Sequence, residues 1–299
     1  MSGELAVRCA ACESLLFGGD RFCEECGAPV ETDGGARSAE DIGIAAAVTE
    51  QGRSHHRNED AYALQQTPDG AVAAVVCDGI STALSGDLAA RGAAAAAVAV
   101  LAGALRDGAE GRELADATRA AAIAARRAVE QVPWTARSDL ALPSCTFVSA
   151  ACRAAEAVIG WIGDSRAYWV ATGDVRQLTV DDSWATEQVA DGLLSAEEAA
   201  VDRRAHALTR WVGVDAPDDA PHLITLRPAT RGRLILCSDG LWNYASEPQH
   251  LATIVAALPP KAAPAAVARR LAAVAMERGG RDDITVVVID LEPARRAAP

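Results

Sequence analysis

Short apolar runs that stop at an acidic residue recur along this chain. Ala71–Cys77 is apolar throughout and is followed by Asp78-Gly79, and Leu234–Cys237 is followed, after one serine, by Asp239-Gly240. Short apolar runs cut off by turn residues are typical of buried strands. A carboxylate at the end of a buried strand needs a cation, hydrogen-bond donors or water, because burying it alone is too costly. The pattern therefore predicts strands whose ends carry chemistry.

The order of predicted strands and helices indicates the fold class. Strands are expected in consecutive runs with helices in pairs between them, which is not the steady strand–helix alternation of a doubly wound sheet. We therefore expect an α+β fold of two mainly antiparallel sheets flanked by helices. Besides the two runs above, the predicted strands are 42–48, 61–64, 147–152, 157–162, 167–171, 223–226 and 283–291, and the predicted helices are 87–105, 112–132, a polar helical insertion at 186–204, and two that end at Leu258 and Glu277.

Acidic residues lie at strand ends five times. Carboxylate oxygens are the ligands that Mg²⁺ and Mn²⁺ prefer, whereas zinc favours sulfur and nitrogen. The alternative is that these residues only cap turns. We expect one oxygen-lined metal site assembled from several strand ends. In addition to Asp78 and Asp239, the positions are Glu59-Asp60 before 61–64, Asp164 after 158–162, and Asp282-Asp283 before 284–289.

Length and charge set limits on the class of protein. The chain has 299 residues, which suits one large domain plus an appendage. Its net charge of −13 argues against a nucleic-acid partner, although acidity also simply aids solubility. No basic stretch followed by an apolar core opens the sequence, and the alanine-rich run Gly92–Leu105 is too short to span a bilayer. We therefore expect a cytoplasmic protein that does not bind membranes.

Four of the eight cysteines form two C-x-x-C pairs near the N-terminus. Two such knuckles can complete a tetrahedral zinc site, and the metal would supply most of the folding free energy of so small a segment. A redox role is the alternative, but no thioredoxin-like β-α-β pattern surrounds the pairs. We predict a zinc ribbon over 1–30 with a docking or regulatory role, a flexible linker over 31–40, the main domain over 41–292 and a disordered tail over 293–299. The four zinc ligands would be Cys9, Cys12, Cys23 and Cys26.

A cationic loop precedes the first acidic pair. It contains Arg53, His55 and Arg57, directly before Glu59-Asp60. Arginine and protonated histidine form charge-assisted hydrogen bonds with phosphate. These three residues are candidates for holding a phosphate beside the metals, and a solvated charged loop is the alternative.

Seven motifs, taken together, resemble those of the metal-dependent protein phosphatases, the type 2C or PPM serine/threonine phosphatases, in their bacterial form. They follow the order of the family and span residues 41–292. The resemblance implies a four-layer α-β-β-α sandwich with a dinuclear Mn²⁺ or Mg²⁺ centre at one end. The motifs are R-N-E-D at Arg57–Asp60, V-V-C-D-G at Val75–Gly79, W-I-G-D-S-R at Trp161–Arg166, Q-L-T-V-D-D-S at Gln177–Ser183, L-T-R at Leu208–Arg210, L-I-L-C-S-D-G-L-W at Leu234–Trp242 and G-G-R-D-D-I-T-V-V at Gly279–Val287.

The resemblance also implies roles for individual residues. Asp78 would bridge both metals, and the carbonyl of Gly79 would bind one of them. Asp239 and Asp282 would complete the other metal, and Glu59 would act directly or through water, with Asp60 nearby. Asp164, with Asp239, matches the position of a third, weaker metal. Residues 186–204 correspond to the mobile flap beside the site.

The chain departs from the family pattern in three ways. The residue five before Asp60 is commonly a phosphate-binding arginine, and here it is His55. Asp78-Gly79 is followed by Ile80 rather than by the histidine or glycine of many relatives, so the acid that protonates the leaving group is unassigned, with a metal-bound water as the default. Asp182 and Asp283 stand where histidine and asparagine are common.

The resulting functional prediction is Mn²⁺- or Mg²⁺-dependent hydrolysis of phosphoserine and phosphothreonine in proteins by a metal-bridged water. The substrates would be proteins phosphorylated by a serine/threonine kinase, and the zinc ribbon would dock a partner. Two alternatives stay open: a catalytically weak phosphatase fold that serves as a binding module, and a phosphatase of small molecules.

Overall fold

The computed structural model describes residues 7–8, 12, 14–16, 25–26, 37–134, 141–218 and 220–293. The chain forms two compact units, Met1–Gly35 and Ala36–Pro299. In the second unit the helices are α1 (Gly86–Arg106), α2 (Gly111–Glu130), α3 (Trp184–Ala190), α4 (Ala196–Ala200), α5 (Asp239–Trp242), α6 (Pro248–Ala256) and α7 (Pro264–Glu277).

Two antiparallel sheets form the centre of the second unit. The six-stranded sheet has the order β11-β10-β14-β15-β4-β3, and the five-stranded sheet has the order β13-β9-β8-β6-β5. A short pair, β7 (Ser144–Cys145) with β12 (Val212–Gly213), lies outside them. The strands of the two sheets are β3 (Arg37–Asp41), β4 (Ala45–Glu50), β5 (Asp60–Gln66), β6 (Val72–Asp78), β8 (Phe147–Arg153), β9 (Glu156–Ile162), β10 (Arg166–Ala171), β11 (Asp174–Gln177), β13 (His222–Leu226), β14 (Gly232–Cys237) and β15 (Ile284–Leu291).

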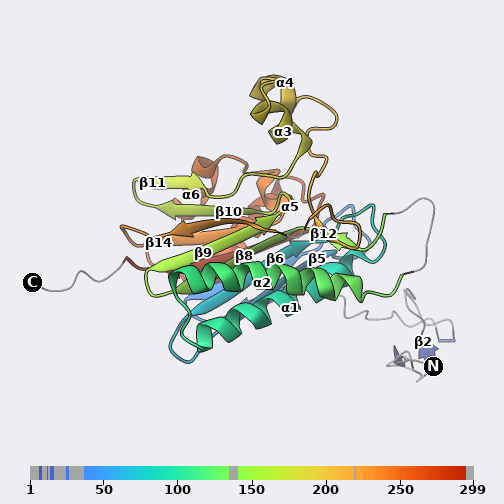
Figure 1. Ribbon diagram of the computed structural model, residues 1–299, viewed down its shortest axis with the longest axis horizontal. Coiled ribbons are helices and arrows are strands. Elements are labelled where there is room, and N and C mark those ends of the chain that lie inside the picture. The colour runs from blue at the N-terminus through green and yellow to red at the C-terminus, as the bar shows by residue number, and fades with distance from the viewer. Residues whose placement is uncertain are drawn as a thin grey trace, which may run out of the picture. The chain divides into compact units, whose positions relative to one another are not determined.

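Three hydrophobic clusters show that these elements stack in four layers (Figure 1). One cluster lies between α1, α2 and the five-stranded sheet, the second between the two sheets, and the third between the six-stranded sheet and α5–α7. Each central strand is therefore covered on both faces, which explains its continuous apolar run. The α+β fold of two antiparallel sheets flanked by helices is confirmed.

Helix α1 corrects one argument made from the sequence. It has 21 residues and is long and apolar enough to cross a membrane, so the expectation that this segment is too short was wrong. Half of its most apolar 18-residue window is buried inside the protein, and Ala89, Ala93, Ala97 and Leu101 have no exposed surface. The apolar composition of α1 thus matches the face that it packs on α2 and the five-stranded sheet (Figure 1).

Strand β3 corrects the predicted linker. Residues 37–40, assigned to a flexible segment, pair antiparallel with β4 at the edge of the six-stranded sheet, and the second unit begins at Ala36 rather than at residue 41. All five residues of β3 are exposed, so backbone pairing holds the strand without an apolar pattern in the sequence. Residues 31–36 and 294–299 lie outside the described residues.

The first unit is described only in part. Its strands β1 (Val7–Arg8) and β2 (Leu15–Leu16) pair antiparallel. Cys12 lies in a turn between them, with its Sγ 2.9 Å from Ser14 Oγ, and Cys26 lies in a second turn. Cys9 and Cys23 lie outside the described residues.

Candidate metal centre

Carboxylates from four parts of the chain meet at one end of the sandwich. A cavity of about 260 Å³ is lined by Asp78 at the end of β6, Asp164 after β9, Asp239 at the start of α5, and Asp282 just before β15. Asp60, at the start of β5, pairs in register with Asp78. The remaining lining residues are Gly79, Ile80, Ser81, Thr82, Thr146, His206 and Leu208. The structure therefore brings together the strand ends that the sequence singled out.

The backbone at Asp78-Gly79 is fixed on both sides. The Asp78 amide donates to Thr146 Oγ1 at 3.0 Å, and the Thr146 amide donates to the Asp78 carbonyl at 2.8 Å. The Gly79 amide donates to the Glu59 carbonyl at 3.1 Å. A Cβ at Gly79 would lie 2.6 Å from the carbonyl carbon of Gly86, so only glycine lets the start of α1 approach this closely.

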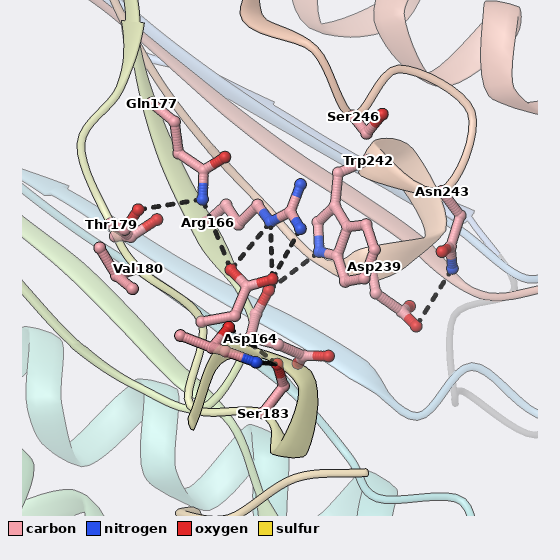
Figure 2. Close-up of polar contacts among 12 residues, drawn as sticks. Asp164, Arg166, Gln177, Thr179, Val180, Ser183, Asp239, Trp242, Asn243 and Ser246 are labelled. Carbon is pink, nitrogen blue, oxygen red and sulfur yellow. Dashed lines mark hydrogen bonds and ion pairs between the residues drawn. The ribbon is translucent and has the colours of Figure 1, made fainter. Parts of the chain in front are cut away.

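Asp239 is held in the same way from the opposite sheet. The Asn243 amide donates to Asp239 Oδ2 at 3.2 Å (Figure 2). A Cβ at Gly240 would lie 1.9 Å from the Asp283 carbonyl oxygen, so the turn after β14 packs directly against the residues before β15. The D-G dipeptide in both motifs thus combines a carboxylate at the cavity with a close backbone approach.

Burial and mutual repulsion perturb these acids strongly. Burial, together with the charges of Asp60, Asp239, Asp164 and Asp282, raises the pKa of Asp78 well above its usual value. Burial and the charge of Asp239 raise the pKa of Asp164 to about 8, and burial and the charge of Asp282 raise the pKa of Asp239 to about 7. An ionised carboxylate in such a place requires a compensating cation.

Buried oxygens without partners indicate what that cation is. In the described part of the chain, Asp60 Oδ1 and Asp239 Oδ1 are buried and accept no hydrogen bond, and no ion pair involves Asp60, Asp78, Asp164 or Asp239. Several oxygen donors around one cavity suit hard divalent ions, and the absence of sulfur from the lining residues argues against zinc there. The donor set fits Mn²⁺ or Mg²⁺.

Asp60 and Glu59 take different places. Asp60 is buried and accepts a hydrogen bond of 2.7 Å from Ser238 Oγ, and burial, with the charges of Asp283 and Asp239, raises its pKa well above the usual value. Glu59 is half-buried, and burial and the charge of Asp283 raise its pKa. Neither residue is among those that line the cavity, in contrast to Asp78, Asp164, Asp239 and Asp282.

The three predicted phosphate-binding residues separate in the structure. His55 Nδ1 lies 2.9 Å from Asp283 Oδ2, and its Nε2 lies 3.4 Å from Asp282 Oδ1, so its ring is next to the carboxylates. Burial alone would lower the pKa of His55, but the hydrogen bond and charge of Asp283 outweigh it and raise the pKa. Arg57 instead pairs with Asp87 at 3.1 Å, and Arg53 is exposed.

Asp283 has a structural role that its sequence position did not reveal. Its carboxylate accepts hydrogen bonds from the amides of Gly52 and Glu59, both at 2.7 Å, in addition to contacting His55. Sequence reasoning treated this residue as added negative charge. Its backbone contacts show that it anchors the cationic loop beside the site.

Trp242 joins the site to a second polar cluster. Its indole N–H donates to the Asp164 carbonyl at 2.9 Å, and the Arg166 guanidinium carbon lies 3.9 Å from its ring centroid (Figure 2). Arg166 in turn pairs with Asp181 at 2.6 Å. The cavity also contains His206, which sequence reasoning missed because a lone histidine in a polar segment carries no local signal.

Comparison with known proteins identifies the family. The sequence matches Protein phosphatase 2C over residues 49–274, which is well over half of the chain. The chain belongs to the protein phosphatase 2C family. It is 29% identical over 247 residues to the serine/threonine phosphatase stp of Listeria welshimeri, an alignment that covers 81% of this chain and 93% of the relative.

Solved phosphatase 2C structures agree with the fold. The serine/threonine phosphatase of S. agalactiae superposes with a TM-score of 0.70 at 24% identity, over 85% of this chain and all of that one. The catalytic domain of the phosphatase PstP, in complex with two manganese ions, gives a TM-score of 0.61 at 26% identity, over 83% of this chain and 98% of that one. The resemblance seen in the sequence is confirmed: this chain is a metal-dependent protein serine/threonine phosphatase.

Proposed function

We propose that this phosphatase hydrolyses phosphoserine and phosphothreonine esters in proteins, with two Mn²⁺ or Mg²⁺ ions held in the carboxylate-lined cavity. The observation that supports it most directly is a group of acids at one cavity, the buried Asp164 and the part-buried Asp78 and Asp239, that has no ion pair among the described residues. The PstP structure with two manganese ions supports the same choice of metal.

In this proposal the ligand set follows the geometry. Asp78 would be a ligand of both ions and the Gly79 carbonyl a ligand of one of them, and Asp239 and Asp282, from the other sheet, would complete the other ion. Glu59 would act on the ions directly or through water, and Asp60 would lie nearby. Asp164, which lines the cavity beside Asp239, would hold a third and weaker ion.

Two bound ions supply a nucleophilic water at neutral pH and offset the charge of the transferred phosphoryl group. The protein's own contribution is position. Thr146 and Glu59 fix the backbone of Asp78-Gly79, and Asn243 orients Asp239. Asp60 remains available to accept a hydrogen bond through its unpartnered Oδ1, which suits it to orient a water beside Asp78.

We further propose His55 as the phosphate contact, because among Arg53, His55 and Arg57 it alone touches a carboxylate of the cavity. Loss of a ground-state phosphate contact raises KM more than it lowers kcat. The test compares KM for His55→Ala, Arg53→Ala and Arg57→Ala. A rise confined to an arginine variant would assign the phosphate to that arginine, and unchanged KM in all three would reject the loop as a phosphate site.

The overall proposal is tested by turnover of phosphoserine peptides, phosphothreonine peptides and small phosphate esters, each with and without Mn²⁺. Mn²⁺-dependent turnover of the peptides supports it. Turnover of metabolite-sized phosphates alone would favour a small-molecule phosphatase. Binding of phosphopeptides without turnover of any ester would favour a binding module.

The N-terminal cysteines form a separate proposal. Cys9, Cys12, Cys23 and Cys26 would hold one structural Zn²⁺, and the pairing of β1 with β2 around the first C-x-x-C supports a knuckle there. One zinc per chain, lost in Cys9→Ser or Cys23→Ser, is the expected result of elemental analysis. Protein expressed with ample zinc that contains none would contradict it.

The role of this ribbon would be to dock a partner rather than to assist the reaction. We expect the protein to be cytoplasmic and its substrates to be targets of a serine/threonine kinase. A shortened chain starting at Ala36, which retains β3, should keep aryl-phosphate turnover. A folded but inactive shortened chain would show that the ribbon takes part in catalysis.

A further inference from the structure

The cavity contains one histidine that no role described so far explains. His206 lines it together with the metal-binding candidates Asp78, Asp164, Asp239 and Asp282. It comes from the C-terminal end of the segment that carries α3 and α4, which projects beyond the sheets (Figure 1). The segment that follows α4 therefore contributes an imidazole ring to the cavity.

The backbone on both sides of His206 is fixed. The Ala207 carbonyl accepts from the Trp184 amide at 2.8 Å, and the Ala205 carbonyl accepts from the Ala185 amide at 3.3 Å. Leu208, two residues after His206, forms an isolated antiparallel bridge with Ser183. These bonds tie the chain on both sides of His206, which itself lies in a turn, to the start of α3.

The ring itself is placed by Trp242. The two ring centroids are 5.7 Å apart, with an interplanar angle of 44°. Trp242 is in turn fixed by its hydrogen bond to the Asp164 carbonyl and by Arg166 against its ring. A chain of contacts therefore runs from Asp181 through Arg166 and Trp242 to the ring of His206.

The other residues around the cavity are poor proton donors for a leaving group. The four carboxylates are required as metal ligands, and the remaining side chains are the aliphatic Ile80 and Leu208 and the hydroxyls of Ser81, Thr82 and Thr146. Histidine is the side chain whose ordinary pKa permits proton transfer near neutral pH. The position after Asp78-Gly79, where many relatives carry histidine, is Ile80 in this chain.

We propose that His206 is the catalytic acid that protonates the departing seryl or threonyl oxygen. This inference rests on the proposed hydrolysis of phosphoprotein esters. As water attacks phosphorus and a P–O bond forms, one proton of that water passes to solvent, the ester P–O bond breaks, and its electron pair takes the proton from the imidazolium of His206. Inorganic phosphate and the free hydroxyl leave, and neutral His206 regains a proton from solvent.

Dependence on the leaving group tests this role. Wild type and His206→Phe are compared with Mn²⁺ on a phosphoserine peptide and on 4-nitrophenyl phosphate. A nitrophenolate leaves without a proton, whereas a serine alkoxide needs one, so an acid matters only for the peptide. We expect kcat on the peptide to fall about 10²-fold or more, with little change on the aryl ester. Phenylalanine retains a ring against Trp242, which separates proton transfer from packing.

His250→Phe is the matched control, because His250 is an exposed histidine of α6 that does not line the cavity. It should leave both rates unchanged. Equal loss on both substrates in His206→Phe, or no loss on either, would overturn the assignment while leaving the phosphatase function intact. A wild type that hydrolyses neither substrate with Mn²⁺ would overturn the proposed function, and this inference with it.

Discussion

Two groups of acids lie near one another in this protein, and they differ in whether a cationic side chain pairs with them. Asp181 and Asp182 are matched by cations: Asp181 accepts hydrogen bonds from Arg166 Nε and Nη2, and Asp182 contacts His222 at 2.8 Å and Arg210 at 3.5 Å. Asp78, Asp164 and Asp239 have no ion-pair partner in the described part of the chain, although they are at least as crowded.

The difference shows which acids are structural and which await a ligand. The charge of an acid that pairs with an arginine is compensated as soon as the chain folds, and removing the arginine leaves that charge uncompensated. The charge of an acid without such a partner is compensated only when a cation binds from solution. Four substitutions or conditions should sharpen or break this contrast.

The largest effect is expected for the unmatched acids. Asp78→Ala and Asp239→Ala should each lower kcat by about 10³-fold or more, because a divalent ion contributes several kcal/mol to the transition state. Steady-state turnover of 4-nitrophenyl phosphate with Mn²⁺ measures this. Calorimetry should show weaker Mn²⁺ binding in the same variants. Near-wild-type turnover in either would sink the metal assignment.

The matched group should respond through stability. Arg166→Ala leaves the part-buried Asp181 without its cation and removes the contact with Trp242, so the unfolding free energy should fall by about 3 kcal/mol. Chemical denaturation gives the value. Arg119→Ala, which removes an exposed pair with Asp116, is the control and should change stability by less than about 1 kcal/mol. Equal losses of unfolding free energy in Arg166→Ala and Arg119→Ala would contradict a larger contribution from the less exposed pair.

Without metal, the unmatched acids should make stability depend on pH. Burial and neighbouring charge raise the pKa of Asp164 to about 8 and that of Asp239 to about 7, so the folded protein retains protons that the unfolded chain has released. Stability in EDTA should therefore fall as pH rises from 5 to 8, by at least about 2 kcal/mol. Excess Mn²⁺ should reduce this slope. A flat profile in EDTA would contradict the raised pKa values of Asp164 and Asp239.

The smallest effect separates the two groups directly. At pH 8 in EDTA, Asp164→Asn removes an unmatched charge and should raise the unfolding free energy by about 1 kcal/mol. Asp182→Asn removes a matched charge and should lower the unfolding free energy, because Arg210 and His222 lose their negatively charged partner. Two changes of the same sign would show that the pairing of these acids does not decide their contribution.

The sequence predicted the unmatched acids well because each follows or precedes an apolar run. A buried strand that stops at Asp-Gly is a local signal, so the ends of β6 and β14 were predictable from the order of residues alone. The two sheets were likewise predictable from the order of strands. The metal site needed only the further step of assuming that these ends meet.

Three features were not predictable, because each depends on long-range contacts. His206 is functional only through its place against Trp242, which is 36 positions away. Asp283 anchors a loop more than 220 residues earlier in the chain, through the amides of Gly52 and Glu59. β3 has no apolar side to report its presence. Backbone pairing and tertiary stacking leave no periodic trace in a single sequence.

Strand β3 has a consequence for how this protein behaves in concentrated solution. Were it absent, β4 would become the edge of the sheet, and its Ala45–Val48 are buried and apolar. Such an edge recruits strands from other molecules and promotes aggregation. The polar sequence of β3 ends the sheet with exposed charges, including Arg37, Glu40 and Asp41, which resist that addition. The five residues that look least structured in the sequence therefore protect the phosphatase unit from self-association.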